Sequence, residues 1–225
     1  NGSGESTVPA GLTNVVAIAA GFNHSVALQS NGVLMAWGYN GRGEVMVPTK
    51  LHGAISASTG SSHQGLTVRS DGTGVGWGWT GYGVSTVPAD LTNMIQLVGG
   101  EYASIALKND GSVSAWGVNS YYGLLNIPAD LTNAIILAGG YNHALALRSD
   151  STVTAWGYNA YGQTDVPSDL TNVVAVAAGS KHSLALKNDG SIVAWGSGAQ
   201  ATVPEGLTNA MQISAGYNHS LEIGR

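Results

Sequence analysis

Short apolar runs alternate with polar turns along the whole chain, and the pattern repeats at an interval of about 39 residues. In the first unit, residues 15–21 are apolar or small throughout, residues 24–28 alternate between apolar and polar side chains, and residues 33–38 form a third apolar segment. Segments of this kind are typical of buried and half-buried β-strands. Ser30-Asn31-Gly32 separates the second and third segments, and Asn-Gly favours the tight turn of a hairpin. The pattern therefore predicts antiparallel strands joined by short turns.

A fourth short segment, residues 44–47, is expected to form a strand that ends at Pro48, because proline has no amide N–H for a ladder. Units of this kind begin near residues 15, 54, 94, 134, 173 and 210. Trp-Gly marks the third segment of five units, at Trp37, Trp77, Trp116, Trp156 and Trp195. This period is typical of a β-propeller blade, whereas a β-solenoid, the alternative, lacks four strands and three tight turns per period. We expect an all-β, six-bladed β-propeller that forms a single domain over residues 1–225.

The two ends of the chain carry incomplete units. The Trp-bearing third segment occurs only five times, and the chain stops after a second segment at residues 221–223. Residues 1–5, Asn-Gly-Ser-Gly-Glu, match the loop Asn-Gly-Arg-Gly-Glu at residues 40–44. We therefore expect the last blade to be shared between the N- and C-termini, with residues 1–9 completing it. Its missing third strand would come from preceding residues or from another chain, because an unpaired strand edge invites association.

One motif recurs with little change. It reads Gly-x-x-His-Ser-x-Ala-Leu, then Asn-Gly or Asp-Gly, then Ala-Trp-Gly, and it is seen between Gly21 and Gly38 and between Gly179 and Gly196. This motif resembles the RCC1-type propeller repeat over essentially the whole chain. The short repeat with Gln-Thr-Asp-Val-Pro at residues 163–167 is most similar to the bacterial branch that includes β-lactamase inhibitory protein II, which has seven repeats rather than six. That resemblance implies a secreted or cell-surface bacterial protein, with a signal segment outside this chain, that binds a β-lactamase through aromatic loops.

Composition narrows the function classes. The formal net charge is −5 and no run of Lys or Arg occurs, so the clustered cations that nucleic-acid binding needs are missing and no nucleic-acid partner is expected. The chain has no cysteine, so disulfide and thiolate chemistry are excluded. No apolar run approaches the roughly 20 residues of a membrane-spanning helix, and we expect no membrane insertion.

Aromatic residues are confined to one kind of loop. Because strands alternate in direction, the first-to-second turns and the loops after the third strands emerge at the same end of each blade. The turns carry Phe22, Tyr102, Tyr141 and Tyr217, and the loops carry Tyr39, Trp79, Tyr82, Tyr121, Tyr122, Tyr158 and Tyr161. Tyr and Trp dominate the energetics of protein interfaces. These residues are therefore the candidate partner-binding surface, with packing between blades as the alternative for each ring.

The histidines follow the repeat instead of converging. His24, His63, His143, His182 and His219 are assigned to one repeat position, which Ala103 occupies in the third unit. Equivalent positions in separate blades cannot meet at one metal ion, so we interpret them as structural hydrogen-bonding residues. No carboxylate pair, nucleophile with a dedicated base or phosphate loop occurs once only, so we expect no catalytic residues, no metal and no cofactor.

The resulting prediction is a non-catalytic propeller that binds another protein through its aromatic loops, with a β-lactamase as the partner that the resemblance suggests. A carbohydrate-binding lectin is one alternative, disfavoured because the aromatic set varies between blades. A structural surface or assembly module is another, in which a second chain completes the last blade.

Overall fold

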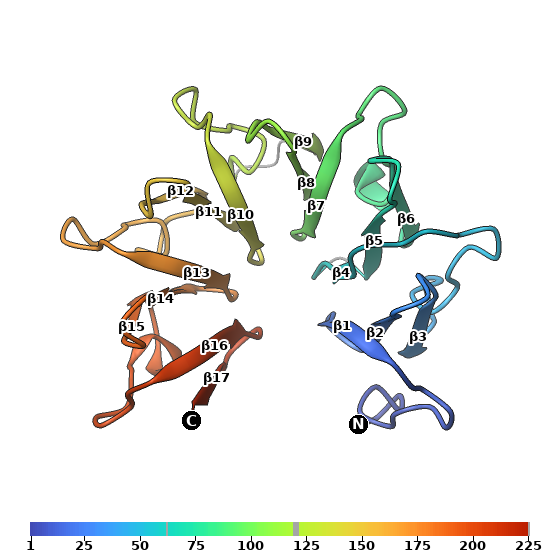
Figure 1. Cartoon of the computed structure of the whole chain (residues 1–225), viewed down its shortest axis with the longest axis horizontal. Helices are drawn as coiled ribbons and strands as arrows, with labels where there is room; N and C mark the ends of the chain where they lie inside the picture. The colour runs from blue at the N-terminus through green and yellow to red at the C-terminus, as the bar shows by residue number, and fades with distance from the viewer. Residues whose placement is uncertain (62, 119–121, 225) are drawn as a thin grey trace. The chain divides into compact units, whose positions relative to one another are not determined.

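The structure is a computed structural model that describes residues 1–61, 63–118 and 122–224. The chain divides into two compact units. Figure 1 labels the strands in chain order. The first unit comprises Asn1–Asn109 and Ser114–Val118, and the second comprises Asp110–Val113 and Asn119–Arg225. Almost all regular structure in both units is β-strand, with two single-turn 3₁₀ helices in loops, η1 (Gly81–Gly83) and η2 (Ala199–Ala201).

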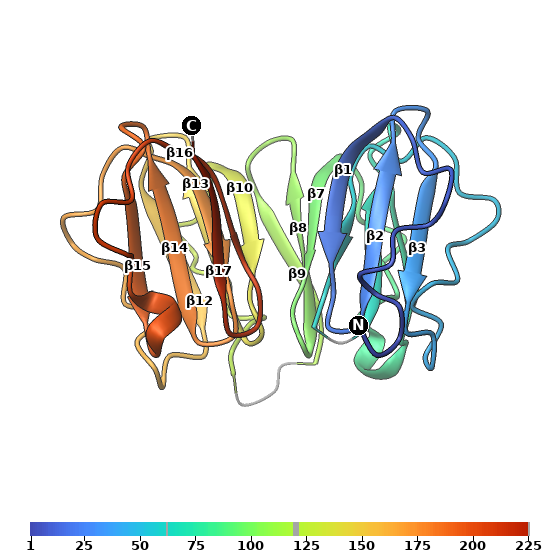
Figure 2. The same ribbon diagram turned by 90° about the horizontal axis from the view of Figure 1, so that it is seen from below.

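Three sheets of three strands lie in the first unit, and within each sheet the strands follow sequence order. They are β1 (Val15–Ala20), β2 (His24–Gln29) and β3 (Leu34–Gly38); β4 (Ser58–Thr59), β5 (Gln64–Val68) and β6 (Gly74–Gly78); β7 (Met94–Gly99), β8 (Ala103–Lys108) and β9 (Val113–Gly117). The first strands of successive sheets contact one another, β1 with β4 and β4 with β7. Figure 2 shows the three strands of the first sheet side by side.

The second unit repeats this arrangement. Its sheets are β10 (Ala134–Gly139), β11 (His143–Arg148) and β12 (Val153–Gly157); β13 (Val173–Ala178), β14 (His182–Lys187) and β15 (Ile192–Gly196); β16 (Ala210–Ala215) and β17 (Ser220–Gly224). The last sheet contains two strands in the described part of the chain. β13 contacts both β10 and β16. The protein therefore has the expected all-β architecture, with six sheets that correspond to six blades.

The hydrophobic core lies between neighbouring sheets and accounts for the repeated tryptophan. In the first unit, Val26 and Leu28 of β2 pack with Trp77 of the next sheet, and Leu66 and Val68 of β5 pack with Trp116. In the second unit, a third cluster joins Leu145 and Leu147 of β11 to Val176, Ala185 and Trp195. Trp77, Trp116 and Trp195 thus fill the space beside the second strand of the preceding sheet, which confirms that these three residues stabilise the core.

The expected fourth strand is wrong. Residues 44–45 lie in a turn and residues 46–47 have no regular secondary structure, with the Met46 N–H donating to the Gly43 carbonyl at 3.0 Å. The Glu44 carbonyl instead accepts the indole N–H of Trp77 at 2.8 Å, and Leu124 and Gln163 accept Trp156 and Trp195 in the same way at 3.0 Å. A segment whose carbonyls bind side chains of the next sheet, and which ends in proline, has little left for a strand ladder.

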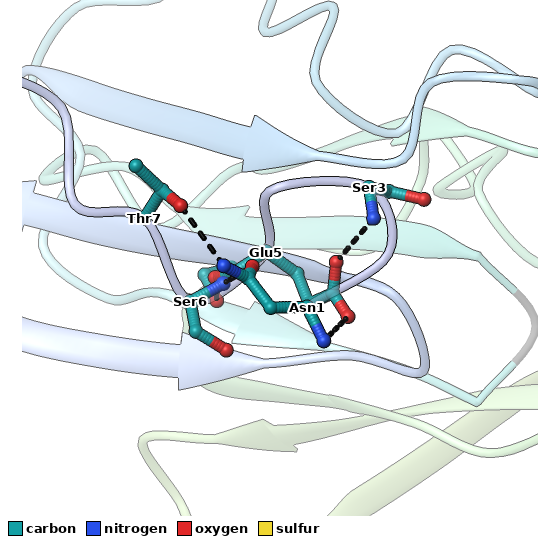
Figure 3. A network of polar contacts seen from close by, with 6 residues as sticks. Asn1, Ser3, Glu5, Ser6 and Thr7 are labelled. Atoms are coloured by element: carbon teal, nitrogen blue, oxygen red, sulfur yellow. Dashed lines mark hydrogen bonds and ion pairs between the residues drawn. The ribbon is translucent and has the colours of Figure 1, made fainter.

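The N-terminal residues fold like the loops that follow the third strands (Figure 3). The Ser3 N–H donates to Glu5 Oε2 and the Ser6 N–H to Asn1 Oδ1, both at 2.9 Å. Residues 40–45 and 159–164 make equivalent bonds. The Glu5 carbonyl then accepts the Ser25 hydroxyl of β2 at 2.9 Å, so this segment packs on the first sheet as a loop of a preceding blade would. That residues 1–9 complete the blade of β16 and β17 stays a prediction.

Candidate aromatic binding site

The candidate residues lie at one end of their sheets. In each three-stranded sheet, the turn between the first two strands and the loop after the third strand lie at the same end, because successive strands are antiparallel. The hairpins between second and third strands lie at the other end and carry aspartates. Asp71, Asp150 and Asp189 each accept a side-chain and a backbone hydrogen bond from the residue two positions on, which lowers the pKa of these carboxyls.

Three rings form a continuous cluster in the first unit, here called cluster 1: Trp79, Tyr82 and Tyr102. Tyr82 is central, with its ring 5.1 Å from those of both Trp79 and Tyr102. The Arg42 guanidinium lies 4.9 Å from the Trp79 ring and extends the cluster with a cation. Tyr82 adopts a positive φ of 61° and remains 50% exposed. Loops of three successive sheets therefore meet in one aromatic surface.

The second unit carries a matching cluster 2, formed by Tyr122, Tyr158 and Tyr161. Tyr158 is central here, with its ring 5.0 Å from Tyr122 and 5.9 Å from Tyr161. The Lys181 ammonium lies 4.4 Å from the Tyr161 ring, and that ring is 38% exposed. Each unit thus presents three rings in contact with a cation stacked on the terminal ring.

The remaining candidates form smaller contacts. Tyr141 and Tyr217 meet edge to face in the second unit with ring centroids 5.3 Å apart. Phe22 and Tyr39 lie 5.9 and 6.1 Å from the His63 ring in the first unit. Tyr121 lies outside the described residues. All ten candidates within the described ranges therefore make ring contacts. The sequence placed the rings in turns and loops at one end of the sheets, but it did not predict which rings would be in contact.

His63 does not occupy the repeat position that the sequence assigned to it. The register pairs Gln64 with Gly78, as it pairs His24 with Gly38, so Gln64 takes the histidine position in the second sheet. Gly60 and Gly78 are separated by one residue more than Gly21 and Gly38, and this spacing was the signal for the shift. His63 adopts a positive φ of 62°, its side chain is 20% exposed, and its Nδ1 lies 2.9 Å from Oε1 of the fully buried Glu44.

At the true histidine position, a side chain forms a hydrogen bond to the next sheet in three cases. His143 Nε2 lies 2.9 Å from Ser183 Oγ, His182 Nε2 lies 3.0 Å from Ser220 Oγ, and Gln64 Nε2 donates to Ser104 Oγ at 3.2 Å. The Ser183 hydroxyl itself donates to the Gln163 carbonyl, so the imidazole must donate to the serine oxygen and is neutral with its proton on Nε2. The structural interpretation is confirmed for these two histidines.

Burial keeps these imidazoles neutral. It lowers the pKa of His143 to about 4, assisted by the charge of His182, and it lowers the pKa of His182 to about 4, assisted by His219. Burial also lowers the pKa of His24, against the opposing effect of the Glu44 carboxylate. In the second sheet, Gly65 occupies the position of the bridging residues Ser183 and Ser220. Both ring nitrogens of His24 are buried and have no hydrogen-bond partner among the described residues.

Within residues 1–61, 63–118 and 122–224, no group of three His, Asp or Glu side chains is arranged to hold a metal ion. No helix in the same ranges has the length and apolar character to cross a bilayer.

Comparisons with known proteins agree with this architecture. Residues 15–44, 135–163 and 173–200 match the Regulator of chromosome condensation (RCC1) repeat family. A search of curated protein sequences finds no match.

Solved structures of other propellers are similar to this chain. A structure of Kap60 bound to yeast RCC1 (Prp20) aligns with a TM-score of 0.76 at 20% identity, over 93% of this chain and 68% of that chain. Prp20p from Saccharomyces cerevisiae, described with its binding to Gsp1p and histones, aligns at 0.77 and 20%, over 94% and 70%. The CRINKLY ectodomain of the Arabidopsis thaliana receptor kinase ACR4 aligns at 0.76 and 20%, over 96% and 79%. The fold is an RCC1-like β-propeller.

Proposed function

We propose that the protein is a non-catalytic binding protein that holds another protein through clusters 1 and 2. The observation that carries this proposal is the pair of three-ring clusters, each with a stacked cation and a central tyrosine on a loop. Rings already in contact lose little conformational freedom on binding, so they supply contact area at low entropic cost. The protein-bound state of the similar yeast RCC1 structure supports a protein as the class of partner.

The finer proposal is that the partner is a β-lactamase and that the protein inhibits it by covering the rim of its active site. Its basis is the resemblance of the short repeat with Val-Pro after the Trp-Gly loop to secreted bacterial inhibitors. Secretion and a bacterial source belong to the same proposal.

The inhibitor proposal is tested by titrating the protein into several class A β-lactamases while following hydrolysis of a chromogenic substrate. Nanomolar inhibition that weakens about 10- to 100-fold in Tyr82→Ala or Tyr158→Ala would support it, since central interface aromatics cost this much when truncated. His52→Ala, an exposed ring outside both clusters, is the matched control. Full hydrolysis at micromolar protein would remove β-lactamases as partners while leaving the protein-binding proposal to its own test.

A further inference from the structure

Clusters 1 and 2 are built from the same four positions of the repeat. In cluster 1 the contacts run from Arg42 through Trp79 and Tyr82 to Tyr102, and in cluster 2 they run from Tyr122 through Tyr158 and Tyr161 to Lys181. Arg42 and Tyr122 each lie two residues before a loop carbonyl that accepts an indole of the next sheet. Tyr102 and Lys181 each lie directly before a second strand. The cation is therefore first in cluster 1 and last in cluster 2.

Both stacked cations lack an anionic partner within the chain. Arg42 and Lys181 are the two Lys or Arg residues in the turns between first and second strands and in the loops between a third strand and the following proline. Each lies over a ring, at 4.9 Å from that of Trp79 and 4.4 Å from that of Tyr161. Neither forms an ion pair with a carboxylate of the residues that the structure describes.

Cations at the opposite ends of the sheets are placed differently. Arg148 Nη2 lies 3.0 Å from Asp130 Oδ2, and Lys187 Nζ lies 3.8 Å from Asp189 Oδ2. These two cations sit on rings in neither case and are each paired with a carboxylate of the chain itself. The pairing of cations at the hairpin ends contrasts with the stacking of cations at the aromatic ends.

The carboxylates of the aromatic loops do not neutralise the stacked cations. Glu44 is fully buried, with its Oε1 at 2.9 Å from His63 Nδ1. Asp165 Oδ1 accepts the Asn159 side-chain amide at 2.7 Å. Glu101 adjoins the last ring of cluster 1 in sequence, at the end opposite the cation. A carboxylate that pairs with either stacked cation must therefore come from a partner.

Stacking prepares both cations for such a partner. The side-chain entropy lost on ordering two long side chains cancels much of the gain of an ordinary exposed ion pair. A ring that already holds the Lys or Arg side chain removes part of this cost before binding. A guanidinium also keeps its planar set of N–H donors for a carboxylate when its face lies on a ring. The rings beside each cation, such as the half-exposed Tyr82, can accept apolar groups next to that carboxylate.

We propose that each cluster binds an acidic segment of the partner protein. An Asp or Glu side chain of that segment pairs with Arg42 or Lys181, and a neighbouring apolar residue packs on the rings beside the cation. This inference rests on the proposed function, since it uses the same two clusters and names the chemistry of the partner. Because the cation is first in one cluster and last in the other, the bound carboxylate lies at opposite ends of the two contact series.

The test selects a phage-displayed library of random peptides of about 12 residues on the immobilised full chain and sequences the retained peptides. We expect Asp and Glu to be enriched about threefold or more over the unselected library, in peptides that also carry apolar residues. A retained peptide is then synthesised with its acidic residue and with the corresponding amide, Asn or Gln. Its affinity is measured for the parent, Arg42→Gln and Lys181→Gln, each first shown to be folded by circular dichroism.

On the parent, the change from acid to amide should weaken binding about fivefold, and on the variant that lacks the paired cation it should matter less than about twofold. Lys50→Gln, the same change at an exposed cation outside both clusters, should behave as the parent does. The difference between the two losses measures the pairing itself, because both proteins keep the same rings.

The outcomes separate this inference from the proposed function. Peptides that are lost on Tyr82→Ala/Tyr158→Ala but show no acidic enrichment would overturn the acidic segment and leave the protein-binding proposal standing. An acid-to-amide change that costs as much on Arg42→Gln and Lys181→Gln as on the parent would do the same. Selection of no peptide, or equal retention by Tyr82→Ala/Tyr158→Ala, would contradict the proposed function and this inference with it.

Discussion

At the scale of single residues, His143 and His182 act as neutral hydrogen-bond donors between sheets. His143 is fully buried, and its pKa of about 4 lies below the 6.5 of a free imidazole because burial penalises the cation. Above pH 6.5 the imidazole is neutral in the folded and unfolded states, so its contribution to stability is complete. Between pH 6.5 and 4 the unfolded chain binds a proton that the folded protein does not, and the free energy of unfolding falls.

The first prediction concerns this pH dependence. His143→Gln should remove about one proton from the difference between the states, which lowers the slope of unfolding free energy against pH by up to about 1.4 kcal/mol per unit between pH 6.5 and 4. Gln64 shows that a glutamine can donate to the bridging serine at this repeat position. Urea unfolding across this range measures the slope. An unchanged slope in His143→Gln would show that His143 does not titrate as described.

Also at this scale, one glycine departs from the repeat for a steric reason. Gly76 stands where the other Trp-bearing strands have alanine, and a Cβ built on it would overlap the backbone carbonyl of Ser85. Restoring the consensus residue should therefore harm the protein.

We predict that Gly76→Ala destabilises the fold by roughly 1–3 kcal/mol, because a backbone atom must move to admit the methyl group. Gly2→Ala, where no atom lies within 4 Å of the added Cβ, is the control and should be close to neutral. Chemical denaturation of both variants measures the difference. A Gly76→Ala protein as stable as the parent would mean that the loop at Ser85 shifts without cost.

At the scale of elements, the loop after each third strand works through its carbonyls. The Gln163 carbonyl joins one loop to both a serine and an indole of the next sheet. The Trp37 indole N–H is buried and has no hydrogen-bond partner among the residues that the structure describes. Trp37 and Trp195 therefore occupy the same position of the Ala-Trp-Gly motif, but only Trp195 donates an indole hydrogen bond.

The third prediction compares them. Trp195→Phe should cost about 1–2 kcal/mol more than Trp37→Phe, because only the first substitution breaks an indole hydrogen bond and leaves a buried carbonyl with one donor fewer. Equilibrium unfolding of the two variants under the same conditions gives the comparison. Equal losses would indicate that ring volume alone determines the contribution of these residues.

Much of the element pattern could be predicted from the sequence. Apolar runs, Asn-Gly and Asp-Gly turns and the Trp-Gly spacing placed the three strands of each sheet, because strand burial and tight turns leave a direct mark on residue type. The prediction of a fourth strand was wrong because hydrogen bonds from distant Trp and Ser side chains to backbone carbonyls do not depend on the residue type of the segment that accepts them. The repeat position predicted for His63 is wrong because one extra residue lies between Gly60 and Gly78, and this shifts Gln64 into the histidine position. The ring clusters were predicted as a set, but their partners and cations depend on loop conformation.

At the scale of the whole molecule, the two ends of the sheets carry different kinds of side chain. The hairpin ends carry Asp side chains satisfied by their own turns, and surface pairs such as Lys187–Asp189 at 3.8 Å contribute little to stability. The opposite ends carry the aromatic rings, in one cluster per unit. Large, pre-assembled and partly exposed rings have no comparable role in the fold, since the core is made by the strand tryptophans and aliphatic residues. The repeat therefore stabilises the fold, and the proposed binding function belongs to the loops.

The most direct test of this assignment is capture of protein partners on the immobilised chain, compared between the parent, Tyr82→Ala/Tyr158→Ala and His52→Ala, each first shown to be folded by circular dichroism. We predict that proteins retained by the parent and by His52→Ala are lost from the double variant, with affinity for a purified partner reduced at least about tenfold. Retention of the same proteins with equal affinity by all three would contradict the claim that clusters 1 and 2 form the binding surface.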